Sequence, residues 1–210
     1  MALETEEEQV EKIKAWWKSN GTTIIMGVVV GVTALFVTQY WMNSQNEDKE
    51  VASVLYTSVL DGLQEGDAAQ VMESGSSILG EYSDSPYAVL TAFALAKVKH
   101  EADDLKAAQT YLQWVLDQSD DTSMLHIARL RLAIVTLDQD KGAEALALLE
   151  GIDQGEFVSQ YEELRGDIQV SLGHYEKARQ AYKVAINTSL GDSSIQQMKL
   201  DDLSDATAGG

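Results

Sequence analysis

Residues 22–42 read TTIIMGVVVGVTALFVTQYWM, and none of these side chains is charged, although 23% of the residues in the whole chain are. As an α-helix that rises about 1.5 Å per residue, this run is roughly 31 Å long, which matches the hydrocarbon thickness of a bilayer. Its β-branched residues lie on every face of such a helix, which argues against a helix buried in a water-soluble core. The sequence therefore predicts a transmembrane helix over residues 22–42.

The competing interpretation of this run is a cleaved signal peptide. The apolar core of a signal peptide is about 7–15 residues long, and small residues follow it at the cleavage site. Here the run is longer, and it ends in the bulky residues Gln39, Tyr40, Trp41 and Met42. We therefore expect an uncleaved anchor.

Lysines on the two flanks of the run predict its orientation. Three lysines closely precede the run, whereas only Lys49 closely follows it. Because an excess of Lys and Arg marks the cytoplasmic flank, we expect residues 1–21 in the cytoplasm and residues 43–210 across the membrane. The three lysines that set this topology are Lys12, Lys14 and Lys18.

Glycine and aromatic residues add two features to the predicted helix. Gly27 and Gly31 form a G-x-x-x-G pair, which lets two membrane helices approach closely, although glycine is also common in membrane helices that do not pair. Aromatic rings favour the headgroup levels on both sides of a bilayer. The residues expected at these two levels are Trp16, Trp17, Tyr40 and Trp41.

Residues 43–210 are numerous enough for one domain with its own core. They contain 12 Lys/Arg and 29 Asp/Glu, a net charge of −17 that repels nucleic acid and excludes a basic binding groove for it. The chain has no cysteine, which excludes disulfides and thiolate metal sites. Neither a phosphate-binding glycine loop nor a nucleophile motif occurs, so we expect no cofactor, no metal, no small-molecule substrate and no enzymatic activity.

Apolar residues recur at helical spacing through most of residues 43–199, and strand signals are scarce, so this domain is predicted to be all-α. Ser159 and Glu162 have the spacing of a capping box, which predicts that a helix begins at Ser159. Residues 200–210 are acidic, rich in small residues and without apolar periodicity. A disordered tail is predicted there.

The predicted helices repeat in pairs. Segments that begin near residues 93, 130 and 164 align so that two small residues and one large residue recur at equivalent positions. The second small residue recurs after 37 and then 33 residues, close to the ~34-residue period of tetratricopeptide repeats. A tetratricopeptide-like solenoid is predicted, with a plain helical bundle as the alternative. The small residues are Ala96, Ala133 and Gly166, then Ala108, Ala145 and Ala178, and the large residues are Leu112, Leu149 and Tyr182.

The residues most able to carry chemistry do not form a recognisable site. His100, His126 and His174 lack metal-binding spacing, so structural roles are expected for all three. The acidic clusters near residues 103, 120 and 138 lack the calcium-loop pattern and predict turns between helices. Most aromatic side chains of the domain should lie in the core, while one or two could line the concave face of the superhelix and grip a segment of a partner.

Several short motifs recur in a characteristic order along the chain. They are Glu7-Glu8-Gln9-Val10-Glu11, Lys14-Ala15-Trp16-Trp17, Asn20-Gly21, the glycine-containing residues 26–32, Tyr40-Trp41, Leu130-Arg131-Leu132-Ala133 and Leu164-Arg165-Gly166-Asp167. No single motif is specific, but their arrangement over roughly residues 5–200 resembles the YfgM family, the ancillary subunits of the bacterial Sec translocon.

The resemblance implies a single-pass inner-membrane protein with a periplasmic tetratricopeptide-like domain that binds other proteins. The implied partners are the Sec translocon and a membrane-anchored periplasmic chaperone, to which newly secreted proteins are passed. The resemblance implies no catalytic residues. Two other functions stay open: an envelope assembly scaffold unrelated to secretion, and a sensor or enzyme subunit regulated by a ligand in the solenoid.

Overall fold

The computed structural model describes the backbone of residues 6–208 and the side chains of residues 8–39 and 48–203. All regular elements in this described part are helical, which confirms the predicted all-α class. The chain divides into two compact units, residues 1–51 and residues 52–210. In chain order the elements are α1 (Glu6–Glu65), α2 (Ala68–Glu81), α3 (Ala88–Glu101), α4 (Leu105–Gln118), α5 (Thr122–Leu137), α6 (Gly142–Leu148), the 3₁₀ helix η1 (Gly155–Phe157), α7 (Val158–Ser171), α8 (Tyr175–Thr188) and α9 (Ser194–Ala208).

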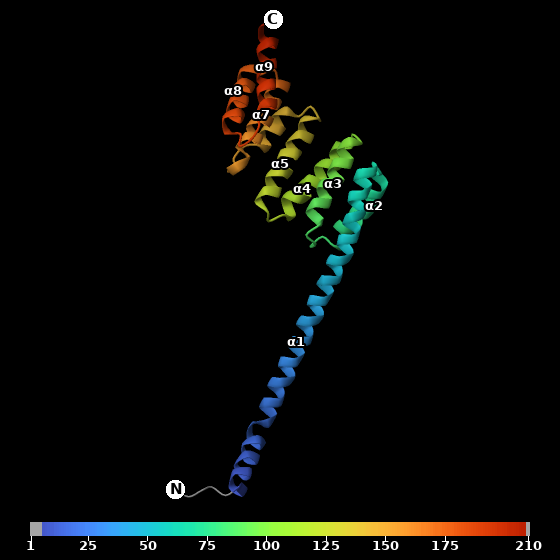
Figure 1. The fold of residues 1–210 in the computed structure, drawn as a ribbon, viewed down its shortest axis with the longest axis vertical. Coiled ribbons are helices and arrows are strands. Elements are labelled where there is room, and N and C mark those ends of the chain that lie inside the picture. The colour runs from blue at the N-terminus through green and yellow to red at the C-terminus, as the bar shows by residue number, and fades with distance from the viewer. Residues whose placement is uncertain (1–5, 209–210) are drawn as a thin grey trace. The chain divides into compact units, whose positions relative to one another are not determined.

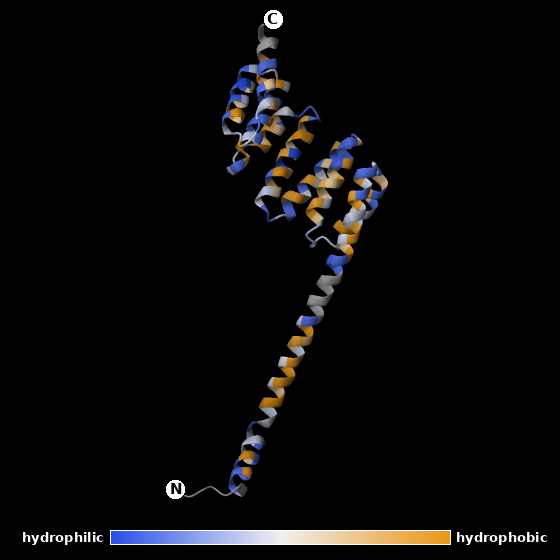
Figure 2. Cartoon of the chain, viewed as in Figure 1, coloured by the Kyte–Doolittle hydropathy of each residue, from blue (hydrophilic) through white to orange (hydrophobic). Residues whose placement is uncertain are grey.

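The first unit consists of the N-terminal part of α1. Among the described residues, its segment Glu8–Gln39 is the one helix that is long and apolar enough to cross a membrane. Hydrophilic residues occur near the start of this segment and hydrophobic residues dominate farther along it (Figure 2), where Leu35 and Phe36 are each 72% exposed. The hydroxyl of Thr33 donates to the Val29 carbonyl at 2.8 Å, so the helix itself satisfies this polar group. A helix of this kind is stable in lipid, where no water is available to hydrogen-bond with its backbone.

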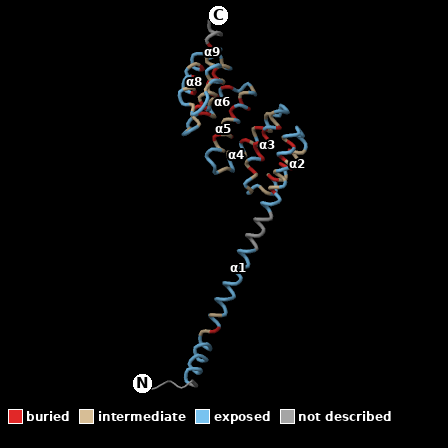
Figure 3. The backbone as a smooth tube through the Cα atoms, viewed as in Figure 1, coloured by how far each residue is buried: buried red, intermediate tan, exposed pale blue. Residues whose placement is uncertain are grey.

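The second unit is a stack of helix pairs. The end of α1 pairs with α2, where the Ser74 hydroxyl donates to that of Ser58 at 2.9 Å, and the next pairs are α3 with α4, α5 with α6, and α7 with α8 (Figure 1). Successive helices pack on one another, and α5, the first helix of its pair, also contacts α3 and α7, the first helices of the neighbouring pairs. Buried residues gather where these helices face each other (Figure 3). This neighbour-to-neighbour packing is that of a tetratricopeptide-like solenoid.

A shared turn shows that the pairs are structural repeats. Gly66, Asp103, Asp140 and Gly173 each occupy the left-handed backbone region, with φ angles of 74°, 59°, 60° and 75°. Each of them lies in the short turn that joins the two helices of one pair. The same unusual conformation therefore recurs at the same place in four successive pairs, the first of which includes the end of α1. Asp103 and Asp140 adopt it without glycine, as aspartate tolerates this region better than most residues.

The small and large residues of the repeat pattern lie in the core. Gly166 of α7 contacts Tyr182 of α8 so closely that an added Cβ would lie 2.3 Å from Cε1 of the tyrosine ring. Close contact between two helices requires a small residue at such a point. The other repeat residues are also buried, at 4% exposure or less: Ala96, Ala108, Leu112, Ala133, Ala145, Leu149, Ala178 and Tyr182.

Two expectations for the C-terminal half are wrong. Helix α7 begins at Val158, and the Ser159 hydroxyl donates to the Ala185 carbonyl of α8 at 2.8 Å instead of capping α7. The tail is not disordered from residue 200, because α9 extends to Ala208 and Leu203 is only 5% exposed. Leu203 is buried against the last pair, whose apolar face would otherwise be open to water, as terminal repeats of a solenoid generally need to be covered.

Candidate functional site: a groove along α3, α5 and α7

Two cavities open along the first helices of the last three pairs. The first cavity, of about 340 Å³, lies between α3 and α5, and Leu112 of α4 also lines it. The second, also of about 340 Å³, lies between α5 and α7. Ile134, which is 40% exposed, lines both cavities and joins them into one surface, here called the groove. The other residues of the groove are Phe93, Ala96, Lys97, His100, Arg131 and Val135 in the first cavity, and Leu130, Leu137, Gln160, Glu163, Leu164 and Asp167 in the second.

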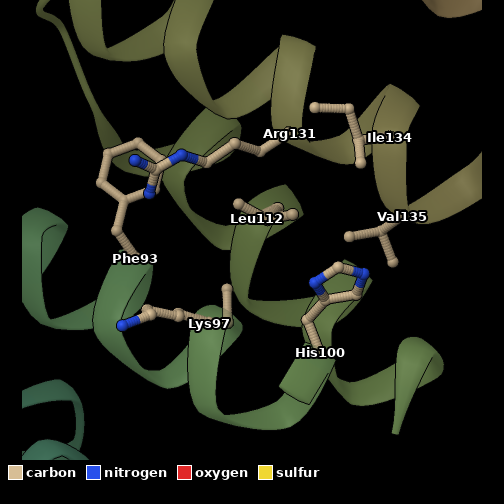
Figure 4. A pocket seen from close by; sticks show the side chains of 8 residues that line it. Phe93, Lys97, His100, Leu112, Arg131, Ile134 and Val135 are labelled. Atoms are coloured by element: carbon tan, nitrogen blue, oxygen red, sulfur yellow. The ribbon is translucent and has the colours of Figure 1, made fainter. Parts of the chain in front are cut away.

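Arg131 and Phe93 form the centre of the first cavity. The guanidinium carbon of Arg131 lies 4.8 Å from the centre of the Phe93 ring, and Figure 4 shows the arginine side chain reaching from α5 across the ring on α3. A cation over the face of an aromatic ring is attracted by the ring quadrupole. Phe93 is only 8% exposed, whereas Arg131 is exposed. The ring therefore holds the arginine in place at the surface of the groove.

The other two basic groups of the first cavity already have acidic neighbours. His100 Nε2 lies 2.6 Å from Asp138 Oδ2, and Lys97 Nζ lies 3.6 Å from Glu101 Oε1. Within the described side chains, no carboxylate forms an ion pair or a hydrogen bond with Arg131. The first cavity is consequently basic, in a chain whose net charge is −19.

The second cavity is acidic, and α9 partly neutralises it. Lys199 Nζ donates to Glu163 at 2.7 Å and to Asp167 at 2.8 Å. Burial lowers the pKa of Lys199, but these hydrogen bonds outweigh burial, so its pKa is raised on balance. The Tyr182 hydroxyl donates to Asp167 at 2.8 Å, and burial together with this hydrogen bond raises the tyrosine pKa. At pH 7 both donors are protonated and hold the two carboxylates in place.

His126 lies on the same helix as Arg131 but inside the core. It is 5% exposed, its Nδ1 lies 3.0 Å from the Tyr161 hydroxyl, and its ring stacks on Phe157 at 4.8 Å between centroids. Burial, followed by the nearby charge of Arg129, lowers the pKa of His126. This is the structural role expected for it. His174 Nδ1 likewise lies 2.9 Å from the side-chain oxygen of Gln169.

A wider depression lies on the other side of α5. It measures about 640 Å³ and is lined by residues of α4, α5 and α6. Most of its lining side chains are polar, and Gln109 donates to Thr136 across it at 2.9 Å. Gln113 also donates to Asp117 at 2.8 Å, so four of its polar side chains already bond with one another.

The residues predicted for the membrane lie in the first unit. A Cβ added at Gly27 or Gly31 would meet nothing within 4 Å beyond the backbone of its own helix, so the face that they share is open to a second helix. Trp16 and Trp17 are 56% and 52% exposed. Lys12, Lys14 and Lys18 are exposed in the same helix. The side chains of Tyr40 and Trp41 lie outside the described residues.

The groove itself was only partly foreseen. One or two aromatic residues were expected to line a binding surface without being singled out; Phe93 lines the groove, and Arg131 and Ile134 were not singled out as binding residues. Helical spacing contains the signal: residues 93, 97 and 100 share one face of α3, as residues 131 and 134 share one face of α5. Among the described residues, no group of three or more His, Asp or Glu side chains converges as a metal site. The arrangement is suited to binding a polypeptide segment.

Comparison with known proteins agrees with this architecture. A family model described as a tetratricopeptide repeat-like domain matches residues 14–205. The ancillary SecYEG translocon subunit of Haemophilus influenzae is 32% identical over 97% of this chain and 100% of its own length, and that of Escherichia coli is 27% identical over 96% and 98%. A solved structure, the MamA RS-1 ArsTM double mutant, shares the fold with a TM-score of 0.53 and 14% identity, covering 76% of this chain and 98% of that one. The chain belongs to the YfgM family of ancillary SecYEG translocon subunits, a non-enzymatic family with a tetratricopeptide-like domain.

Proposed function

We propose that this protein is an ancillary subunit of the Sec translocon, anchored by residues 22–42, whose groove binds segments of secreted proteins and passes them to a membrane-anchored periplasmic chaperone. The observation that carries the proposal is the groove, an open and partly apolar surface along α3, α5 and α7. The relatives named above support the translocon as the partner. A tether of this kind raises the effective concentration of the groove near its partners, so individual contacts can be weak.

Site-specific photo-crosslinking tests the binding role of the groove. A photoreactive phenylalanine derivative would replace Ile134 in the groove or, as a control, Val184 on α8. The two residues are 40% and 42% exposed, so they are equally accessible to solvent and differ in whether they line the groove. We expect a secreted protein arrested during translocation to crosslink at position 134 and not at position 184. Equal crosslinking at both positions, or none at position 134, would overturn the binding role.

The orientation of the anchor is part of the proposal and has its own test. Because the chain has no cysteine, single cysteines at Glu8 and at Gln113 can be labelled without background. In intact spheroplasts, a membrane-impermeant maleimide should label Gln113→Cys but not Glu8→Cys, since the lysine-rich flank is expected in the cytoplasm. Labelling of Glu8→Cys but not of Gln113→Cys would show that the orientation is the opposite of the proposed one. Replacing Lys12, Lys14 and Lys18 together by glutamine should make the labelling of the two positions more nearly equal.

A further inference from the structure

We infer that the cavity between α3 and α5 binds the side-chain carboxylate of an acidic residue within an extended, apolar segment of a partner protein, and that Arg131 is the residue that binds it. This inference rests on the proposed function of the groove and adds the chemistry of the segment that the groove selects.

Arg131 has no acidic partner among the described side chains. The chain contains 34 Asp and Glu residues, and yet none of those with described side chains pairs with this arginine. Instead the guanidinium lies over Phe93 at 4.8 Å. No described hydrogen bond or ion pair uses the N–H groups of this guanidinium, so they are available to a ligand. A guanidinium binds a carboxylate through two parallel hydrogen bonds from these groups, so Arg131 is ready for such a ligand.

Apolar side chains line the cavity around the arginine. Leu112 and Val135 lie at the floor of the cavity, at 1% and 4% exposure, and Ile134, at 40%, is the apolar side chain most open to a ligand (Figure 4). An acidic residue that stands next to apolar residues would bury them against this lining while its carboxylate reaches Arg131. A carboxylate alone, such as free acetate, would gain only the charged contact.

The shape of the groove favours a side-chain carboxylate over the carboxylate at the C-terminus of a chain. The first cavity does not end the groove, because Ile134 also lines the second cavity, where Glu163 and Asp167 lie. The backbone of a segment bound at Arg131 can therefore continue along the groove toward α7. The carboxylates at that end disfavour a second acidic residue there, so the preferred segment carries its acidic residue at the α3 end only.

Fluorescence anisotropy with the full-length protein in detergent micelles tests the inference. The probe is a pool of fluorescein-labelled, C-terminally amidated heptapeptides with glutamate at the fourth position and randomised apolar residues around it. Matched pools carry glutamine instead of glutamate, either amidated or with a free C-terminal carboxylate. We expect the glutamate pool to bind about tenfold more tightly than the amidated glutamine pool, with the preference weakened in high salt.

Variants assign the preference to Arg131. Arg131→Gln should bind both amidated pools equally, and Arg131→Lys should keep only part of the preference, since lysine retains the charge but loses the paired N–H groups. Arg129→Gln is the matched control, with the same charge change on the same helix outside the groove, and should keep the full preference. A preference that is absent in the unmodified protein, or that survives Arg131→Gln, overturns the inference. A glutamine pool that regains affinity through its free C-terminus overturns the assignment to a side chain. If the glutamate preference fails these tests while crosslinking at Ile134 still occurs, the carboxylate preference alone is overturned and the proposed function of the groove stands.

Discussion

The two units of this molecule differ in the exposure of their apolar side chains. In residues 22–39, apolar side chains such as Leu35 and Phe36 are each 72% exposed, whereas Leu95 and Leu149 of the helix pairs are fully buried. The helix pairs bury their apolar faces against one another because water surrounds them. The described side chains of residues 22–39 are mostly exposed, and a bilayer is the solvent in which that exposure is favourable. The two units therefore differ in what covers their apolar side chains: neighbouring helices in residues 52–210 and, by the prediction above, lipid in residues 22–39.

A charged residue in the middle of the predicted span should have the largest effect on the difference between the two units. Val32→Arg should lower membrane integration, because arginine at the centre of a membrane helix costs about 2.5–3.5 kcal/mol on insertion scales. Alkaline extraction of membranes measures the integrated fraction. Val54→Arg is the control, since Val54 is 67% exposed in the same helix but outside the predicted span, and it should remain membrane-bound. Equal extraction of the two variants would contradict the membrane assignment.

Close packing in the other unit is tested by Gly166→Ala. Its added Cβ would lie 2.3 Å from the Tyr182 ring, and overpacking of this kind costs about 1–3 kcal/mol. Thermal unfolding, followed by circular dichroism, should show a lower midpoint. Gly80→Ala is the matched control, because a Cβ there meets nothing within 4 Å and alanine favours a helix, so its midpoint should be unchanged or higher. Adding Tyr182→Leu to Gly166→Ala should recover part of the loss; a midpoint unaffected by Gly166→Ala would refute the packing argument.

Helix caps give a smaller effect that is also confined to the repeats. Asp121 Oδ1 accepts hydrogen bonds from the backbone N–H groups of Ser123 and Met124 at 2.8 and 3.1 Å, so Asp121→Ala should cost about 1 kcal/mol of unfolding free energy. Asp120→Ala makes the same charge change one residue earlier and should cost less. Denaturant unfolding of both variants measures the difference. Similar losses would show that charge, and not capping, is responsible.

The weakest expected effect is a pH dependence in the repeat unit. Because the pKa of folded His126 is lowered below that of the unfolded chain, the unfolded state binds more protons as the pH falls below about 6.5. Stability is thus fully present above that pH and decreases as the pH falls toward the folded pKa. His126→Gln should flatten this part of the stability profile, measured as the unfolding midpoint between pH 7 and pH 5. An unchanged slope would assign the dependence to other groups.

Most of the architecture could be predicted from the sequence, because it depends on patterns that a single helix carries. The charge-free run predicted the membrane-capable helix, and the recurrence of small residues such as Ala133 and Gly166 predicted stacked pairs. The wrong predictions share one cause: they were judged from local sequence. Residues 200–210 are acidic, rich in small residues and without apolar periodicity, yet Leu203 is buried against the last pair. Ser159 has the spacing of a cap, yet its hydroxyl bonds with Ala185 on another helix.

The site was less predictable than the fold for the same reason. Arg131 belongs to a short motif that was noticed for its place in the chain, and nothing in that motif indicates a neighbouring aromatic ring. Phe93 lies 38 residues earlier in the sequence, and only the packing of α5 on α3 brings the two side chains together.

The amino-acid sequence by itself determined the membrane-capable helix and the helical period, since charge, apolar spacing and small residues act within one or two turns of chain. Only the tertiary structure decided which side chains meet across helices: the ring that holds Arg131, the isoleucine that joins two cavities, and the lysine of α9 that bonds with Glu163 and Asp167. Those contacts depend on distances between elements far apart in the chain, and side-chain identity alone does not specify such distances.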